Sequence, residues 1–461
     1  MTAKLHQTRD FAVKALVLTL FVFTFSCKKE NFERVAVNSS DNSSATAAQK
    51  PNIVLILMDD VGYEVPGYTG GQSYSTPAID MLAQSGLQFS QMQAAPNCSP
   101  SRNMLLTGKY NFRNYIDWGI LDTTQSTFAN LLHDQGYATC IAGKWQMDGG
   151  DASIRGAGFD KYLIWLPYRD NESSENWYRY KNPHLYENGA MLPESETNGK
   201  YSEDMFTEYI SNFIDSNRTN PFFVYYSMSL AHYPFTPTPD DPDYATWTPE
   251  SHTSRIRYFP SMVKYMDKKI QEVVTKINES GLASNTIIMV LGDNGTPEQI
   301  SSLWRGQTVS GGKGSTTQFG THVPMIVSWP GHIFPGTIDT NLTDLTDFLP
   351  TMANIARTSV PASYGTTDGV SFYSALKNNL APKRKWVFCQ WQSFTTAPVS
   401  SFNKWAQTLS YKLYDDSVHG HKFYNIVKDT LEQNSIKRST ITPEEQTIKR
   451  QLQQVINNMH N

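Results

Sequence analysis

Residues 51–60 read PNIVLILMDD, a run of β-branched, leucine and methionine side chains that ends in two aspartates. A strand that is apolar at nearly every position is buried on both faces, as in the parallel sheet of an α/β protein. Polar residues directly after such a strand lie at its carboxyl end, where open α/β sheets bind their ligands. The run therefore predicts an α/β fold and places Asp59 and Asp60 at a functional edge of the sheet.

The chain beyond this run alternates helix and strand patterns. Thr76-Pro77 is typical of a helix start and Gly86 of a helix end. The predicted helices cover 77–83, 127–133, 204–214 and 262–277, and the predicted strands cover 138–142, 222–229, 286–291 and 324–328. This alternation predicts a large mixed, mainly parallel sheet sandwiched by helices.

The pattern changes after about residue 380. Short apolar runs there predict a small antiparallel sheet, with strands at 386–389, 405–409, 411–414 and 422–426. Thr442 as N-cap and Pro443 as first helical residue then begin a terminal helix that runs to Met459. We therefore expect a main domain over residues 51–380 and a small C-terminal subdomain over residues 381–461.

The first 50 residues carry a targeting signal. Basic residues precede an apolar stretch at 15–25, which is shorter than the roughly 20 residues that span a bilayer, so residues 1–26 are predicted to be a signal peptide. Cys27 follows at once and resembles the lipidated cysteine of a bacterial lipoprotein, with a plain secretory signal as the alternative. We expect residues 27–50 to be a flexible lipidated tether. The protein would then be a membrane-anchored lipoprotein of the cell envelope, on its periplasmic or surface face.

Composition excludes several classes of protein. The chain has 461 residues, of which 39 are basic and 43 acidic, so the net charge is −4. A chain without basic excess is not built to bind nucleic acid, and an anionic substrate would need a local cationic pocket. The four cysteines are too few for a disulfide scaffold, and Cys140 and Cys389 lie in apolar runs typical of buried thiols.

Polar clusters follow four of the predicted strands. Asp59-Asp60 follows the first strand, and Lys144 to Gln146 follows the strand at 138–142. His232 follows the strand at 222–229, and Asp293-Asn294 follows the strand at 286–291. Because the carboxyl ends of parallel strands meet at one edge, these side chains are expected to converge. Three carboxylates and one amide oxygen are hard ligands that suit calcium, or less well magnesium, and not zinc.

Residues 98–109 read CSPSRNMLLTGK, and this string resembles the maturation signature of the formylglycine-dependent sulfatases. Pro100 suits a helix start, so free N–H groups near Cys98 would face an anion. A buried thiol beside a turn is the alternative, but it accounts for the cysteine alone. Further elements from residue 50 to residue 437 resemble the same family within the alkaline phosphatase superfamily, among them Gly143-Lys144-Trp145 and Val323-Pro324.

The resemblance implies an activity, a metal and a set of roles. Residues 51–380 would form a catalytic domain that hydrolyses sulfate esters. A maturation enzyme would convert Cys98 to formylglycine, whose hydrate attacks sulfur. The implied ligands of one calcium ion per chain are Asp59, Asp60, Asp293, Asn294 and the oxidised Cys98. Arg102 would orient the formylglycine. The sulfate oxygens would be bound by Lys144, His232 and Lys313, and His232 would protonate the leaving alcohol.

Two departures from the family pattern bear on these roles. Gln146 stands where the family normally has a histidine after Gly-Lys-Trp, and a glutamine donates a hydrogen bond but takes no proton near neutral pH. We expect Gln146 to hydrogen-bond the formylglycine or a sulfate oxygen. Gln318 and His322 replace the usual glutamate and arginine, a pair expected to brace the loop after Lys313.

The segment at 162–186 is rich in aromatic and basic residues. Aromatic faces stack on sugar rings and arginines pair with sulfate or carboxylate, so four residues are candidate substrate contacts: Trp165, Arg169, Trp177 and Arg179. An insertion that packs on itself is the alternative. With the lipoprotein signal, the segment favours a sulfated glycan as substrate. Two other functions stay open, a phosphonate or phosphodiester hydrolase and a catalytically dead surface glycan-binding lipoprotein.

Overall fold

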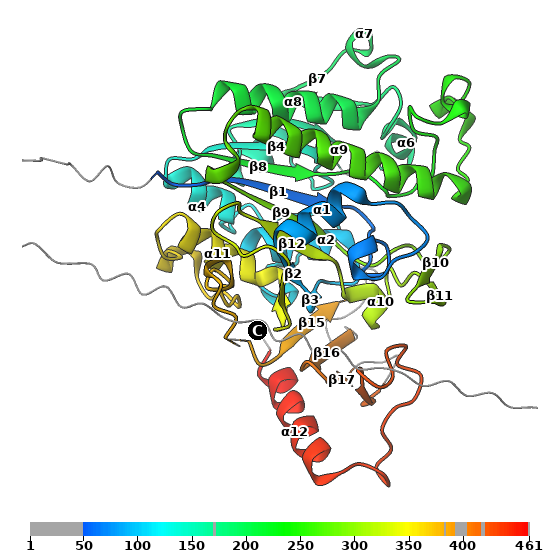
Figure 1. Ribbon diagram of the computed structural model, residues 1–461, viewed down its shortest axis with the longest axis vertical. Helices are drawn as coiled ribbons and strands as arrows, with labels where there is room; N and C mark the ends of the chain where they lie inside the picture. Colours follow the sequence, from blue (N-terminus) through cyan, green and yellow to red (C-terminus); the bar gives the residue numbers. More distant parts are fainter. Residues whose placement is uncertain (1–48, 169–171, 382–383, 392–402, 416–419, 460–461) are drawn as a thin grey trace, which may run out of the picture. The chain divides into compact units, whose positions relative to one another are not determined.

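One ten-stranded mixed sheet forms the centre of the protein (Figure 1). The computed structural model describes residues 49–168, 172–381, 384–391, 403–415 and 420–459. The strand order is β13-β2-β12-β9-β1-β8-β4-β5-β6-β7. The run at 51–60 supplies the central strand β1 (Asn52–Met58), which pairs in parallel with β9 (Thr286–Gly292) and with β8 (Phe222–Ser227).

Five neighbouring strands of this sheet are parallel. Beyond β8, the strands β4 (Ala138–Lys144) and β5 (Lys161–Trp165) continue in the same direction. On the other side of β9, the strand β12 (Met325–Ser328) is antiparallel. The outer strands are β2 (Leu87–Phe89), β13 (Thr337–Asp339), β6 (Leu185–Glu187) and β7 (Ala190–Met191). The carboxyl ends of β9, β1, β8, β4 and β5 therefore lie along one edge.

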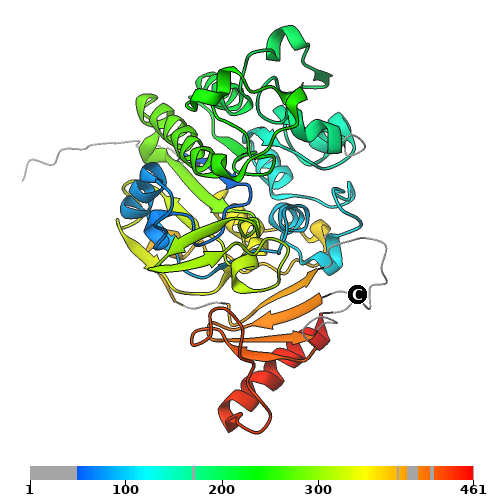
Figure 2. The ribbon, with the colours of Figure 1, turned by 90° about the vertical axis from the view of Figure 1, so that its right-hand side faces the viewer.

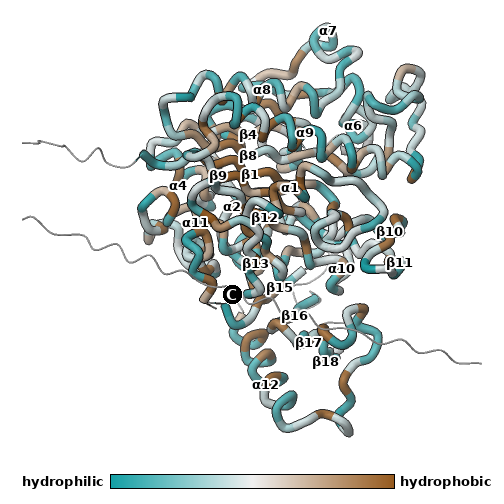
Figure 3. Tube along the Cα trace, in the orientation of Figure 1, coloured by the Kyte–Doolittle hydropathy of each residue, from teal (hydrophilic) through white to brown (hydrophobic). Residues whose placement is uncertain are grey.

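Helices cover both faces of the sheet, which confirms the predicted α/β sandwich. Along β1, Ile53 and Leu55 join one hydrophobic cluster and Val54 and Ile56 join the other. The Val54 face is covered by α1 (Pro77–Ser85), α8 (Ser202–Ser216) and α9 (Phe259–Glu279). The Ile53 face is covered by α2 (Cys98–Thr107), α4 (Phe128–Asp134) and α11 (Phe348–Ile355). The most hydrophobic segments gather along the central strands (Figure 3).

The ends of the helices follow from capping residues that local sequence reveals. Thr127 closes a capping box at the start of α4, and Thr442 does the same before α12 (Pro443–Asn458). Helices α8 and α9 extend two or three residues beyond the predicted ranges at each end, because all the added residues except Phe259 are polar or proline and carry no apolar periodicity. The predicted strand at 222–229 ends at Ser227.

The C-terminal part forms the predicted antiparallel sheet with a helix against it. Its strands are β15 (Val387–Trp391), β16 (Asn403–Gln407), β17 (Tyr411–Asp415) and β18 (Phe423–Asn425). Helix α12 packs on β16 and β17 (Figure 2). The hydrophobic cluster on the Ile53 face of the main sheet continues into this subdomain, so the two share a core.

The remaining described elements are short. The strands are β3 (Met92–Gln93), β10 (Ser301–Trp304), β11 (Gln307–Ser310) and β14 (Thr343–Asp344). The helices are α3 (Asn111–Asn114), α5 (Gly150–Gly156), α6 (Glu172–Glu175), α7 (Glu194–Thr197) and α10 (Gln318–Thr321). No helix within the described ranges has the length and apolar character needed to cross a membrane. Residues 1–48, including the predicted signal peptide, Cys27 and most of the tether, lie outside the described residues.

Candidate active site

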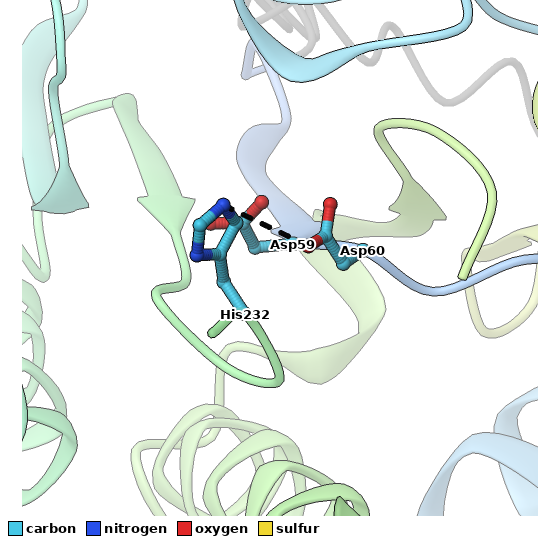
Figure 4. A group of neighbouring side chains, drawn as sticks. All are labelled: Asp59, Asp60 and His232. Atoms are coloured by element: carbon cyan, nitrogen blue, oxygen red, sulfur yellow. Dashed lines mark ion pairs between the residues drawn. The ribbon is translucent and has the colours of Figure 1, made fainter. Parts of the chain in front are cut away.

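The carboxyl edge of the five parallel strands brings the predicted polar clusters together. Asp59 and Asp60 follow β1, Lys144 is the last residue of β4, and Asp293 follows β9. His232 lies in the loop after β8, and its imidazole faces the two carboxylates at the end of β1 (Figure 4). These side chains come from distant parts of the chain, and they meet only because parallel strands end at the same edge.

Cations and carboxylates alternate across this site. The ammonium group of Lys144 donates to Asp59 Oδ2 at 2.7 Å, and that of Lys313 donates to Asp60 Oδ2 at 2.7 Å. His232 Nε2 lies 3.7 Å from Asp60 Oδ2. Both aspartates are fully buried. Because buried charges require partners, this pairing holds the two carboxylates and the two lysines in fixed positions.

Two oxygens in the cluster are placed to bind a cation. Asp59 Oδ1 and Asn294 Oδ1 are buried and accept no hydrogen bond from the residues that the structure describes. Ligand atoms of Asp59, Asp60 and His232 lie within 4.8 Å of one another. Asp293 is part of the same cluster, because its Oδ1 accepts the backbone N–H of Asp60 at 3.0 Å. Unpaired buried oxygens on a dense set of carboxylates fit a hard divalent cation, so the donor set suits the predicted calcium.

Cys98 occupies the first turn of α2, beside this cluster. Asn97 caps the helix through its side chain, which accepts the N–H of Cys98 at 2.9 Å. The thiol is buried, and its sulfur lies 3.7 Å from Gln146 Oε1. Burial raises the pKa of Cys98 above its usual value, although Lys144 and Lys313 oppose the shift. The unmodified thiol is therefore a poor nucleophile, since the thiolate is the reactive form.

Arg102 lies one turn further along α2 and holds Asp293. Its Nε and Nη2 donate to Asp293 Oδ2 at 3.2 and 2.9 Å. Its Nη1 donates to the hydroxyl of Ser227 and to the carbonyl of Lys144, and Ser227 in turn donates to that carbonyl at 2.7 Å. Ser227 was not among the predicted site residues, because the sequence predicted its strand to run to residue 229 whereas β8 ends at Ser227. Arg102 therefore connects helix α2, which carries Cys98, to the ends of β9, β8 and β4.

The field of these charges shifts the pKa values of the aspartates in opposite directions. Burial alone would raise the pKa of Asp59, but Lys144, Arg102 and Arg179 outweigh it, and the pKa is lowered. Burial and the charge of Asp59 raise the pKa of Asp293 to about 6, against the effect of Arg102. A cation at this site would relieve the repulsion between the two carboxylates.

The aromatic and basic segment at 162–186 contributes some residues to the main sheet and others to the site. Trp165 ends β5 and is fully buried, so its prediction as a sugar-stacking surface is wrong; its ring instead supports the guanidinium of Arg179 at 4.0 Å. Arg179 reaches the site, with Nη1 at 3.6 Å from Asp59 Oδ2. Trp177 is half-buried and stacks on His252. Arg169 lies outside the described residues.

The C-terminal sheet braces the loop that carries Lys313. The ammonium group of Lys412 and the hydroxyl of Tyr414 both bond the carbonyl of Thr316. Glu432, which is paired with Lys412 at 3.3 Å, accepts the N–H of Gln318 at 2.9 Å. Gln318 and His322, which replace the family pair expected to brace this loop, contact separate partners. The side chain of Gln318 donates to Gln407, and His322 bonds the carbonyl of Ser90 and stacks on Tyr63.

Replacing Lys412 with methionine should therefore weaken both the fold and the activity. It leaves the buried Glu432 without its cation, which should lower the free energy of unfolding by about 3 kcal/mol, and it releases the loop behind Lys313. Urea unfolding and kcat/KM check the two effects. Lys269→Met is the matched control. Lys269 is a buried lysine on helix α9, where it pairs with Asp204 of α8 and with Glu272. Equal loss of activity per folded molecule in both variants would contradict the bracing role.

Comparison with known proteins agrees with this geometry. The model of the Sulfatase family matches residues 51–358, and that of the N-sulphoglucosamine sulphohydrolase C-terminal region matches residues 317–461. Bovine arylsulfatase A is 30% identical over 357 residues, covering 70% of this chain and 67% of its own length. Mouse arylsulfatase G is 29% identical over 368 residues, covering 69% of this chain and 67% of its own length.

A solved structure resembles the whole described fold. The crystal structure of Ps i-CgsB in complex with k-i-k-neocarrahexaose superposes with a TM-score of 0.72 at 25% identity, covering 88% of this chain and 93% of that one. The family match extends over most of the chain and includes every strand end that builds the site. The chain therefore belongs to the sulfatase family of the alkaline phosphatase superfamily and is a hydrolase of sulfate esters.

Proposed function

We propose that this sulfatase removes sulfate from a sulfated glycan, with formylglycine formed at Cys98 by a maturation enzyme and with one calcium ion. The observation that carries the proposal is the position of Cys98 at the start of α2, beside the buried carboxylates and lysines at the carboxyl edge of the sheet. Of the two other functions considered, the sulfatases among the sequence relatives disfavour a phosphonate or phosphodiester hydrolase. The pairing of lysines and carboxylates in the site disfavours a dead binding protein.

The surroundings of Cys98 support a modified residue. The thiol has a raised pKa, so it is protonated at neutral pH and weak in attack. Converted to formylglycine, the residue would supply a hydrated aldehyde with two hydroxyl groups. One hydroxyl would attack sulfur as the bond from sulfur to the leaving alcohol breaks, and loss of the proton of the other hydroxyl would let the aldehyde form again as sulfate leaves. Gln146, at 3.7 Å from the sulfur, is placed to hold one of these hydroxyl groups.

The residues proposed for calcium are Asp59, Asp60, Asp293 and Asn294. Two of their oxygens are buried without a hydrogen-bond partner among the described residues, and a bound cation would supply the missing partner. When bound, calcium would lower the pKa of the attacking hydroxyl and offset charge on the sulfate oxygens. Lys144 and Lys313 lie beside the same carboxylates and are placed to bind those oxygens, which gain charge as the ester bond breaks.

His232 is proposed to give a proton to the leaving alcohol. Its Nδ1 lies 2.5 Å from the carbonyl of Tyr233, which assigns the proton of the neutral ring to Nδ1 and turns Nε2 toward the site. Burial and the charges of Arg179, Lys313 and Lys144 lower the pKa of His232 well below its usual value. A bound sulfate ester adds negative charge among these cations, and this favours the protonated ring that the reaction needs.

An aromatic rim beside His232 supports a glycan substrate. Trp177 stacks on His252 with ring centroids 4.9 Å apart, and its edge meets Tyr233, whose ring is 41% exposed. Since Tyr233 directly follows His232, a sugar stacked on this rim would lie next to the leaving-group side of the site. Ps i-CgsB, which shares the fold at 25% identity, was solved with k-i-k-neocarrahexaose. Sulfate release from a panel of defined sulfated and desulfated oligosaccharides tests this proposal. Release only from aryl sulfates would contradict it.

We also propose a cell-envelope location, with the chain anchored to a membrane by lipid on Cys27. The proposal rests on the apolar stretch at 15–25 and on the cysteine that follows it. Placement in the envelope agrees with a large external glycan as substrate.

Gln146 and His232 should differ in their effect on the rate. Gln146→Ala removes one hydrogen bond to a polar group, which should cost roughly 1.5–3 kcal/mol, or about 10- to 150-fold in rate. His232→Ala removes the proposed proton donor and should cost more on a sugar sulfate, whose alcohol leaves poorly. It should cost less on an activated aryl sulfate.

Single-turnover kinetics on both substrates check this division of roles. His332→Ala is the control, because His332 stacks on Trp329 away from the site. A larger loss in Gln146→Ala than in His232→Ala on the sugar sulfate would show that the roles are assigned wrongly.

A further inference from the structure

We propose that Arg179 binds the sulfate group of the substrate, as an additional cation in the same pocket as Lys144 and Lys313. The inference deepens the proposed function and rests on it, since it assigns a further residue to the proposed sulfate site. It replaces the looser sequence-based expectation that Arg179 contacts some anionic group of a glycan.

The guanidinium of Arg179 is held rigidly at the edge of the metal cluster. The side chain is fully buried, and Nη1 lies 3.6 Å from Asp59 Oδ2. One face of the guanidinium packs on Trp165 at 4.0 Å, and Nη2 donates to Asn176 Oδ1 at 2.9 Å. A planar group fixed by a ring, an amide and a carboxylate has little freedom, so its remaining donors point in a defined direction.

Two nitrogens of this buried group lack an acceptor. Arg179 Nε and Nη1 make no hydrogen bond within the described part of the chain. Buried donors on a charged group are costly unless a partner satisfies them. Nη1 lies on the Asp59 side of the guanidinium, where an oxygen of a tetrahedral oxyanion can accept from it in a charge-assisted hydrogen bond. The missing acceptor of Nη1 is therefore one that a sulfate group would bring.

The charge balance of the cluster favours the same ligand. Lys144 pairs with Asp59, Lys313 pairs with Asp60, and Arg102 pairs with Asp293. Arg179 has no such carboxylate of its own among the ion pairs of the described residues and shares Asp59 with Lys144. These four cations and three aspartates leave one positive charge in excess, and a calcium ion would add two more. An arginine with a purely structural role would need its own counter-charge, whereas this excess suits an anionic ligand.

The chain next to Arg179 ties it to the leaving-group side of the site. The hydroxyl of Tyr180 lies 2.7 Å from the carbonyl oxygens of both Ser229 and His232. Tyr180 thus fixes the position of the segment that carries Arg179 relative to the loop that carries His232.

The test measures sulfate affinity in the full chain, matured to formylglycine and loaded with calcium. Arg179→Met should raise the inhibition constant for inorganic sulfate roughly 10- to 100-fold, because a charge-assisted hydrogen bond is lost, and should lower kcat/KM by at least as much. Arg179→Lys should recover part of the affinity. Arg155→Met is the matched control, since Arg155 pairs with Asp151 at 2.8 Å and lies over the ring of Tyr162, away from the site. It should bind sulfate like the wild type.

The outcomes separate this inference from the function on which it rests. If wild-type enzyme hydrolyses sulfate esters while folded Arg179→Met and Arg179→Lys are inhibited by sulfate as strongly as the wild type, the inference is wrong and the proposed function stands. If matured, calcium-loaded wild type neither binds sulfate nor turns over a sulfate ester, both are wrong. Should Arg179→Met fail to fold, Arg179→Lys decides. A lysine lacks the planar group that packs on Trp165 and bonds Asn176, so retention of full sulfate affinity in that variant would overturn the proposed contact.

Discussion

Replacing Cys98 with alanine is expected to abolish turnover of sulfate esters, with a loss of roughly 10⁴- to 10⁶-fold. Alanine cannot become formylglycine, so the nucleophile is removed while Lys144, Lys313 and the carboxylates stay in place. Because Cys98 is buried in the first turn of a capped helix, the smaller side chain should fit without loss of the fold. Turnover of a sulfated oligosaccharide and thermal unfolding check the two halves of this result.

Cys140→Ala is the matched control, because Cys140 is also a free, buried thiol but lies within β4. It should keep activity at a small cost in stability. Mass spectrometry of the peptide that contains residue 98 should show the aldehyde in active wild-type protein. An active preparation that contains only intact thiol would disprove the assignment of the nucleophile.

Asp293→Ala should cost both the metal and the activity. It removes a proposed calcium ligand and also leaves Arg102 with a single carboxylate neighbour, Asp59, at 3.8 Å. We expect wild-type protein to contain about one calcium ion per chain, and the variant to lose calcium and at least about 100-fold in rate. Chelation of the wild type should lower its unfolding temperature, since an ion that binds only the folded state stabilises it.

Asp347→Ala distinguishes loss of the metal from loss of an ion pair. Asp347 is a buried aspartate bonded to Arg384, which has a second carboxylate neighbour, Asp344, at 3.3 Å. Both variants therefore break one buried arginine–aspartate pair and should lose similar stability, about 3–5 kcal/mol. Metal analysis should find calcium retained in Asp347→Ala alone. Equal calcium content in the two variants, or wild-type rates in chelated Asp293→Asn, would remove the support for the metal site.

Local sequence was sufficient for the fold class and for the convergence of the polar residues that follow the parallel strands. The apolar run at 51–60 marks a strand buried on both faces, and the structure places it in the centre of the sheet. Asp59, Lys144 and Asp293 each follow a recognisable strand, so the common edge of parallel strands predicts their convergence. Thr442 and Pro443 likewise mark the start of α12 through local capping chemistry.

The fate of the aromatic segment could not be predicted in this way. In the sequence, Trp165 and Arg179 were equally good candidates for substrate contact, because both lie in the same aromatic and basic segment. The structure makes Lys161–Trp165 a strand of the main sheet, so the Trp165 ring is buried, and it carries Arg179 back over that ring to Asp59. The pattern of a strand shows which of its side chains are buried, but it does not show which other segment of the chain packs on them.

Only the tertiary structure decided which charged residues pair with one another. Lys144 pairs with Asp59 across 85 positions of the chain, and Lys313 pairs with Asp60 across 253. Lys412, in the C-terminal sheet, bonds the carbonyl of Thr316 behind Lys313. The sequence by itself determines secondary structure and the burial of each face, because periodicity and capping act over a few residues. Ion pairs between distant elements depend on how packed layers align in three dimensions, and a buried charge accepts whichever partner that packing brings within reach.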